Sequence, residues 1–285
     1  MRIRKRRKGE KNYYYLEHNF RKGKKIIKKE KYLGSEIPEN IDKIKDDFFK
    51  EIQRDLNLKL ESIRENFQKE WRKVPESAKK RELEEISVAF TYNTNAIEGS
   101  TITLEETREI IKDKIAPKKS LRDIRETESH NKVFLEMLEK KEKISGKLLL
   151  KWHNELFSNT KPDIAGKYRD YIVTIANHLP PDPEIIDKLM RSLINYINKS
   201  KVNPVELSAR AHYRFEKIHL FGDGNGRIGR LLMNHILWCV GYPMLIIEYK
   251  KRASYYKALK NDEDKFLNYF IRRYISVHKK RIKNS

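Results

Sequence analysis

The sequence predicts a mainly α-helical protein, and three observations support this fold class. Beyond the first 35 residues, apolar side chains recur at the spacing of amphipathic helices, as at Ile41, Ile44 and Phe48. Segments rich in strand-forming residues are confined to 13–33 and 171–175. The sequence contains neither an internal repeat nor a low-complexity linker. We therefore expect a helical body that carries two small β elements.

The first β element is a basic hairpin within residues 1–35. Tyr13–Phe20 and Lys25–Leu33 are rich in strand formers, and Gly23 between them suits a turn. Gly34 ends the second strand. Because a lone hairpin is marginally stable in water, we expect it to dock on the helical body or on a partner.

The helical body follows from periodicity, capping residues and glycine or proline stop signals. The capping box Thr103–Glu106 begins one short helix. The other helices that we expect cover residues 41–74, 82–96, 121–139, 145–157, 185–197, 204–218, 228–240, 253–260 and 264–280.

Positive charge is concentrated at the N-terminus. The chain has a net charge of +22, and residues 1–35 hold fourteen Lys and Arg against three Glu, which is +11. This concentration is typical of a segment that binds an acidic partner, with nucleic acid the first candidate. A solvated Lys/Arg face without a partner explains the charge equally well. Both interpretations stay open.

The remaining composition indicates a cytoplasmic protein without a membrane span. The single cysteine, Cys239, excludes an intramolecular disulfide and favours a reducing compartment. The longest apolar region, residues 231–247, is interrupted by polar residues, glycine and proline, so we expect a buried helix and strand rather than a span. The N-terminus lacks the apolar segment of a secretory signal.

One stretch, residues 219–230, combines the residue types of a phosphate-transfer site. His219 has an ordinary pKa of about 6.5, which suits a proton acceptor at neutral pH. Asp223 is the one acid, a candidate ligand for Mg²⁺. The glycine turn at 224–226 precedes the apolar helix 228–240, and a helix that begins at such a turn presents free N–H groups to phosphate. Two arginines three positions apart add donors on one face.

This stretch resembles the signature of the Fic family (filamentation induced by cAMP), H-x-F-x-[D/E]-G-N-G-R-x-x-R. Every fixed position is matched, by His219, Phe221, Asp223, Gly224, Asn225, Gly226, Arg227 and Arg230. The resemblance implies a Fic-type helical bundle with a small β-hairpin flap, and it extends over roughly residues 85–275. We expect three segments: a basic hairpin extension (1–35), a helical region with an inhibitory helix (36–100) and the Fic domain (101–285).

The resemblance also implies an activity: transfer of AMP from ATP to a Ser, Thr or Tyr hydroxyl of a target protein. His219 is then the base and Asp223 the Mg²⁺ ligand. The phosphate-binding residues are then Gly224, Asn225, Gly226, Arg227 and Arg230. Relatives that phosphorylate their targets carry lysine in place of the second motif glycine, so Gly226 favours nucleotidyl transfer. Phosphocholine transfer, which a few relatives perform, is not excluded by the motif.

Further site residues are implied by the same resemblance. The β-prone residues Ile172, Val173, Thr174 and Ile175 resemble the flap that pins an extended segment of the target by strand addition. Their alternative is a buried strand without a special role. Tyr255, Tyr256 and Asn261 resemble the family's adenine and ribose contacts. Two adjacent helical tyrosines are more often one core and one surface residue.

Residues 94–99 match the family's inhibitory pattern [S/T]-x-x-x-E-[G/N]. Thr94 and Glu98 are one helical turn apart and share a face. The resemblance pairs Glu98 with Arg230, where its carboxylate competes with the γ-phosphate of ATP. The alternative is an ordinary helix end with an exposed Glu. Some relatives use this Glu to position water for the reverse reaction, de-AMPylation, and relatives often form homodimers.

Overall fold

A computed structural model describes residues 1–22, 25–174 and 179–282 of the chain. The chain divides into two compact units. Unit 1 comprises residues 1–63 and 275–285, and unit 2 comprises residues 64–274. The boundaries between the units fall within the long helix α1 (Ile41–Lys73) and within α10 (Glu263–Val277). The three-segment division expected from the sequence stays a prediction.

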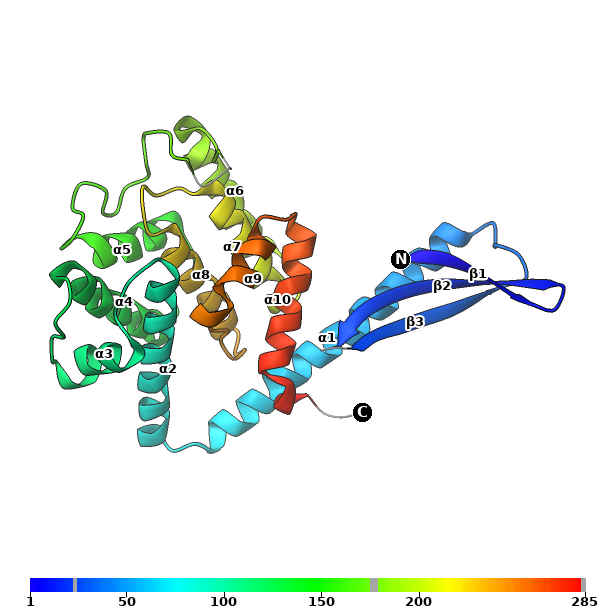
Figure 1. Ribbon diagram of the computed structural model, residues 1–285, viewed down its shortest axis with the longest axis horizontal. Coiled ribbons are helices and arrows are strands. Elements are labelled where there is room, and N and C mark those ends of the chain that lie inside the picture. The colour runs from blue at the N-terminus through cyan, green and yellow to red at the C-terminus, as the bar shows by residue number, and fades with distance from the viewer. Residues whose placement is uncertain (23–24, 175–178, 283–285) are drawn as a thin grey trace. The chain divides into compact units, whose positions relative to one another are not determined.

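Unit 1 contains a three-stranded antiparallel sheet in the order β1 (Arg2–Lys8), β2 (Lys11–Lys22) and β3 (Lys25–Gly34) (Figure 1). The hairpin expected from the sequence forms β2 and β3. The prediction missed β1, because six of its seven residues are Lys or Arg and only Ile3 favours a strand. Pairing with β2 stabilises this charged strand, and charge on an edge strand discourages aggregation.

Helix α1 covers one face of this sheet. Leu16 of β2 and Phe48 of α1 are each 1% exposed and belong to the apolar interior. Lys29 of β3 extends from the same face and pairs with two carboxylates of α1, Glu51 at 3.0 Å and Asp55 at 2.6 Å. The hairpin therefore docks on a helix of its own unit, as its marginal stability requires.

Unit 2 is helical, and its elements follow the order expected from the sequence (Figure 1). Its elements are α2 (Glu76–Ile97), α3 (Leu104–Arg108), the π-helical η1 (Glu109–Asp113), α4 (Leu121–Lys140), α5 (Gly146–Phe157), η2 (Pro183–Ile185), α6 (Ile186–Lys199), α7 (Pro204–Ile218), α8 (Asn225–Cys239), η3 (Tyr249–Lys251) and α9 (Arg252–Leu259), followed by α10. Within the described ranges, no helix is both long and apolar enough to cross a membrane.

Helix α8 lies at the centre of unit 2. Nearly all of its residues are buried, which is the pattern of a helix surrounded by protein on every side. It packs against α7 along its length and also contacts α2, α4 and α5. Side chains such as Phe215 and Leu231 fill the interior between these helices. The residue that begins α8, Asn225, is therefore held in a rigid core.

Two helix starts agree with the sequence, the first with its predicted capping box and the second with its predicted position. Thr103 Oγ1 accepts a hydrogen bond from the backbone N–H of Glu106, and the Glu106 carboxylate accepts one from the backbone N–H of Thr103, which completes the capping box. Ser145 Oγ accepts a bond from the backbone N–H of Leu148 at 3.2 Å. Helix α2 begins earlier than expected, directly after Pro75, because proline suits the start of a helix.

The strand expected at 171–175 is wrong for the residues that the structure describes there. Residues 171–174 form no strand, and Ile175 lies outside the described residues. A strand requires a neighbour for its backbone hydrogen bonds, and β-branched composition alone does not supply one.

Candidate active site

Helix α7 positions His219 at its C-terminal end. Asn203 begins the helix by accepting a hydrogen bond from the backbone N–H of Val205. His219 ends it in the left-handed conformation (φ 49°), and its N–H still donates to the carbonyl of Phe215 at 3.1 Å. A residue other than glycine rarely adopts this conformation, so the surrounding contacts must hold His219 in it.

The surroundings of His219 keep its imidazole neutral. Burial lowers the pKa of His219 to about 4, and the nearby backbone of Glu216 only partly opposes this effect. At pH 7 the ring therefore carries no charge and can accept a proton, which is the requirement for a general base.

The loop between His219 and α8 is closed by a single side chain. Asn225 Oδ1 accepts a hydrogen bond from the backbone N–H of Phe221 at 2.9 Å, and Asn225 Nδ2 donates to the carbonyl of Phe221 at 2.8 Å. Phe221 is itself buried. The Asn225 amide therefore shapes the turn that presents the first N–H groups of α8.

Two glycines of this turn admit close approach by other groups. Gly224 has φ 78°, and a Cβ atom there would lie 2.3 Å from the Phe157 ring. A Cβ atom on Gly226 would lie 2.2 Å from Oε1 of Glu98 and 3.0 Å from Nη1 of Arg230. The sequence predicted that the glycine turn leaves space for a phosphate. In the structure, the carboxylate of Glu98 lies in the space beside Gly226.

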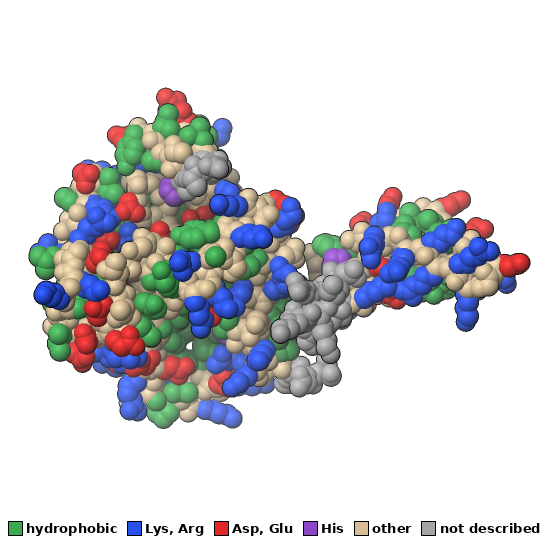
Figure 2. All heavy atoms as spheres, in the orientation of Figure 1, with side chains coloured by type: hydrophobic (Ala, Val, Ile, Leu, Met, Phe, Trp, Pro, Cys, Tyr) green, Lys and Arg blue, Asp and Glu red, His purple; other side chains and the backbone are tan. Residues whose placement is uncertain are grey.

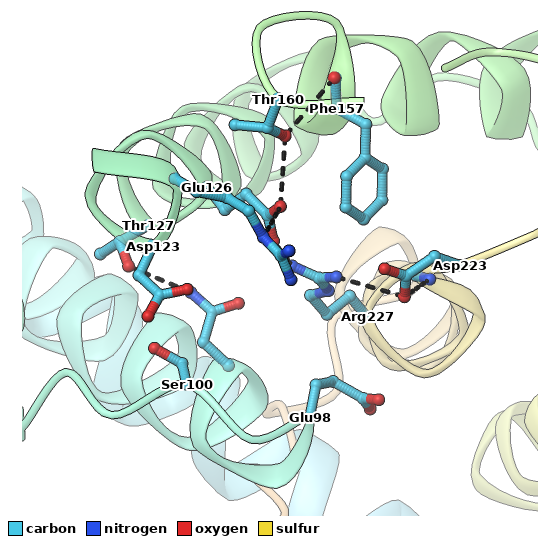
Figure 3. A network of polar contacts seen from close by, with 12 residues as sticks. Glu98, Ser100, Asp123, Glu126, Thr127, Phe157, Thr160, Asp223 and Arg227 are labelled. Atoms are coloured by element: carbon cyan, nitrogen blue, oxygen red, sulfur yellow. Dashed lines mark hydrogen bonds and ion pairs between the residues drawn. The ribbon is translucent and has the colours of Figure 1, made fainter. Parts of the chain in front are cut away.

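A network of charges surrounds Asp223 and Arg227 (Figure 3). The Asp223 carboxylate pairs with Lys161 and lies 3.5 Å from Nη2 of Arg227. Arg227 pairs in turn with the buried carboxylate of Glu126, which also accepts a hydrogen bond from Thr160 at 3.2 Å. Figure 3 shows Arg227 between Glu126 and Asp223, close to the Phe157 ring, whose centroid lies 4.5 Å from Cζ.

The donor set at Asp223 fits a magnesium ion in part. Burial opposes ionisation, but Arg227 and Lys161 lower the pKa of Asp223, so the carboxylate is charged at neutral pH. Its side chain is 42% exposed, which leaves access for an ion. Mg²⁺ binds through one or two carboxylates and completes its shell with phosphate and water oxygens, so one carboxylate is sufficient. In the described residues, no cluster of three or more potential ligands exists.

Arg230 is the most enclosed cation of the motif, with 1% exposure. Its Nε donates to Thr94 Oγ1 at 2.5 Å, and Nη2 donates to the Thr94 carbonyl at 3.2 Å. Nη2 also donates to Glu98 Oε1 at 2.6 Å. Helix α2 thus places both residues of the predicted inhibitory pattern on the guanidinium that the resemblance assigns to the γ-phosphate.

Two positioning residues had no assigned role in the sequence analysis. His153 accepts a hydrogen bond from the N–H of Gly166 at Nδ1 (2.9 Å), so Nε2 carries the proton that it donates to the Asp223 carbonyl (3.0 Å). Its ring stacks on Phe221, with centroids 3.8 Å apart. The sequence around His153 does not indicate this role, because its two partners are distant in the chain.

Arg169 is the second positioning residue. Its guanidinium donates to the carbonyls of His219 (2.8 Å), Tyr171 (2.8 Å) and Pro181 (2.6 Å). A buried arginine therefore ties the residue that precedes the expected flap to the candidate base. Nothing in the sequence around Arg169 indicates these carbonyl contacts, because two of the three partners lie in segments further along the chain.

The remaining predicted residues lie in different environments. Tyr255 is buried, and its hydroxyl is 2.7 Å from Nε2 of His212. Tyr256 is 40% exposed and donates to the carbonyl of Ile97 at 3.2 Å, next to Glu98. Asn261 is exposed and donates to the carbonyl of Lys257. The adjacent tyrosines are thus one core and one surface residue, and the nucleotide-binding role of all three stays a prediction.

Comparisons with known proteins place this geometry in a family. A family model described as Fic/DOC matches residues 143–237. The chain is 35% identical over 201 residues to a protein named protein adenylyltransferase Fic from Nematostella vectensis, and the match covers 68% of this chain and 47% of that protein. The chain belongs to the Fic/DOC family. It spans about half the length of this Fic relative.

Solved Fic structures have the same fold. Fic-1 from C. elegans, solved as a fragment, is 28% identical with a TM-score of 0.69, and the match covers 82% of this chain and 72% of that one. A Fic domain signalling protein from Bacteroides thetaiotaomicron is 26% identical with a TM-score of 0.68 over 79% of this chain and 96% of that one. The expected mainly helical Fic fold is therefore confirmed.

Proposed function

We propose that this protein transfers AMP from ATP to a hydroxyl group of a target protein. The observation that carries the proposal is a neutral, buried His219 on the loop that leads into a glycine turn and the N-terminus of α8. Relatives named protein adenylyltransferase support the same reaction. The hydroxyl oxygen attacks the α-phosphorus, the bond to the β-phosphate oxygen breaks, and pyrophosphate leaves with its electron pair.

The polar and charged groups around the loop have distinct roles in this reaction. His219 accepts the proton of the attacking hydroxyl, since its imidazole is neutral at pH 7. The N–H groups of residues 224–227 and the guanidinium of Arg227 stabilise the charge that develops on the phosphates. Asp223 holds Mg²⁺, which neutralises phosphate charge when bound. Lys161 is a second cation at the same carboxylate.

We propose that Glu98 inhibits this reaction in the resting protein. Its carboxylate forms an ion pair with Arg230 and occupies the space over Gly226. The γ-phosphate requires the same guanidinium, and a carboxylate beside it repels phosphate. ATP therefore binds productively only when Glu98 leaves Arg230.

Residues 172–175 are the proposed docking segment for the target. Ile172 is 69% exposed, and residues 171–174 are not paired in a strand, so their backbone groups suit strand addition by an extended peptide. Arg169 fixes the start of this segment relative to the base through the carbonyls of Tyr171 and His219.

De-AMPylation is a second candidate, favoured by the position of Glu98 over the glycine turn. A carboxylate there can orient a water molecule toward a phosphate ester. The two directions are distinguished by incubating an AMP-modified target with wild-type protein and with Glu98→Gly, and measuring the AMP released.

The proposed function is tested with α-³²P-labelled ATP, Mg²⁺ and native-source lysate. Glu98→Gly is expected to raise label incorporation, and His219→Ala in the same background is expected to abolish it while ATP binding is retained. Mass spectrometry of the labelled band then identifies the target. Full activity of Glu98→Gly/His219→Ala would refute the assignment of the base, and absence of transfer by Glu98→Gly in the presence of bound ATP would refute AMP transfer.

A further inference from the structure

One face of the unit 1 sheet carries a row of arginines. Residues that pair directly across antiparallel strands lie on the same face. Arg2 pairs with Glu17, Arg4 with Tyr15, and Arg6 with Tyr13, so these arginines share one face with an acid and two tyrosines. The alternate residues, among them Leu16 and Lys29, face α1. The arginine face is therefore the one that α1 leaves open to solvent.

A buried carboxylate organises this face. The side chain of Glu17 is fully buried, and Arg2, Arg4 and Arg6 lie 3.4, 3.7 and 3.3 Å from it. Lys28 from β3 makes a fourth contact. Burial raises the pKa of this acid, but the contacts outweigh it, and ion pairs with cations such as Lys28 lower the pKa of Glu17 to about 2. The acid thus stays charged and holds four cations in place.

The cations are in excess and accessible. Among the described residues, only Glu17 and Glu30 oppose these four cations, which leaves a net charge of +2 on the cluster. The arginine side chains are 40–64% exposed. Each guanidinium has five N–H donors and uses only some of them on the acids, so outward donors remain for a ligand. Figure 2 shows Lys and Arg side chains gathered over this sheet.

Three tyrosine rings lie beside the arginines. Tyr32 of β3 pairs with Tyr15, and their ring centroids are 5.3 Å apart. Tyr13 completes the group at 6.3 Å from Tyr32, whose side chain is prominent with 54% of the residue exposed. The Arg6 guanidinium lies 4.4 Å from the Tyr15 ring centroid. Aromatic rings and stacked guanidinium groups on an open sheet are the features on which unpaired bases stack.

We propose that this arginine and tyrosine face of unit 1 binds single-stranded nucleic acid. The arginines contact the phosphates, and the exposed edge of the tyrosine group, above all Tyr32, stacks a base. An anionic membrane surface fits less well, because the described side chains of this face are arginine, lysine, glutamate and tyrosine rather than the large aliphatic groups that insert into a bilayer. This function is independent of AMP transfer, because it uses only residues of the sheet.

The test measures binding of the full-length protein to a fluorescein-labelled oligothymidylate by anisotropy over a series of salt concentrations, without ATP. Wild type is expected to bind more weakly as salt rises. Arg2→Ala/Arg4→Ala is expected to reduce the slope of log K against log salt by about 1.4, because each phosphate contact on a single strand contributes about 0.7. Tyr32→Ala is expected to weaken binding about tenfold with an unchanged slope, and Tyr32→Phe to retain it.

The matched control removes two positive charges elsewhere. Lys199 and Lys201 are exposed residues at the end of α6, and Lys199→Ala/Lys201→Ala is expected to keep the wild-type slope. Circular dichroism verifies that each variant is folded. Equal slopes for the arginine variant and this control would overturn the proposal, as would wild-type affinity of Tyr32→Ala or tighter binding of a blunt duplex than of the single strand.

Discussion

Replacing Glu98 by Gln tests the proposed inhibition most directly. The substitution keeps the size of the side chain and removes its charge. Nη2 of Arg230 donates to the carboxylate at 2.6 Å, and a hydrogen bond between charged groups contributes about 1.5–3 kcal/mol. Because the Glu98 side chain is 27% exposed, we take the lower limit, about 1.5 kcal/mol. This energy corresponds to roughly a tenfold shift toward the state in which Arg230 is free for phosphate.

The assay has two readouts. ATP affinity measured by isothermal titration calorimetry and AMP incorporation from labelled ATP should both rise about tenfold in Glu98→Gln, and at least as much in Glu98→Gly. Glu105→Gln, which removes an exposed carboxylate from the nearby α3, serves as the charge-matched control and should behave as wild type. Unchanged ATP affinity in both Glu98 variants would refute the reasoning, since the ion pair would then not limit access.

Three other predictions concern pH, metal binding and stability. Burial depresses the pKa of His219 in the folded protein from about 6.5 to about 4. The value of kcat/KM should therefore stay level as pH falls from 7 to 5 and decline only near pH 4. A decline centred at pH 6.5 would contradict this assignment. The Lys161→Ala variant should bind Mn²⁺ about tenfold more tightly than wild type, because the lysine ammonium no longer competes with the ion for the Asp223 carboxylate. Electron paramagnetic resonance without nucleotide measures this affinity, and equal affinities of variant and wild type would exclude the competition. Glu126→Gln removes the charge of the buried partner of Arg227, which leaves only the more distant carboxylate of Asp223, and should lower the free energy of unfolding by about 3 kcal/mol in urea titrations. Glu85→Gln, at an exposed pair, should cost less than about 1 kcal/mol, and similar losses for the two variants would contradict the assignment of a buried pair.

Local sequence signals predicted the elements whose determinants are close together in the chain. The spacing of Thr94 and Glu98 indicated a shared helical face, and both residues contact Arg230. The glycine turn before α8 was likewise readable, because turn residues and helix periodicity are local properties.

The missed features depend on contacts between distant segments. Glu126 and Arg227 are 101 positions apart, and nothing in the sequence of α4 distinguishes Glu126 from a solvated acid. Strand β1 has only one strand-forming residue, Ile3, and exists because β2 pairs with it. The opposite error occurred at residues 171–174, where strand-forming residues have no partner strand in the described structure. Tertiary pairing decided all three cases.

The close approach of Glu98 to Gly226 couples two positions that are distant in the sequence. A methyl group at 226 would meet the mobile end of the Glu98 side chain rather than rigid backbone, so the carboxylate is the group that must move. Any side chain at 226 is therefore expected to disengage Glu98 from Arg230 by its bulk alone. A lysine there, as in the branch that phosphorylates its targets, is incompatible with this carboxylate in place. If Glu98 inhibits as proposed, the residue at 226 is therefore expected to decide whether this carboxylate can stay on Arg230.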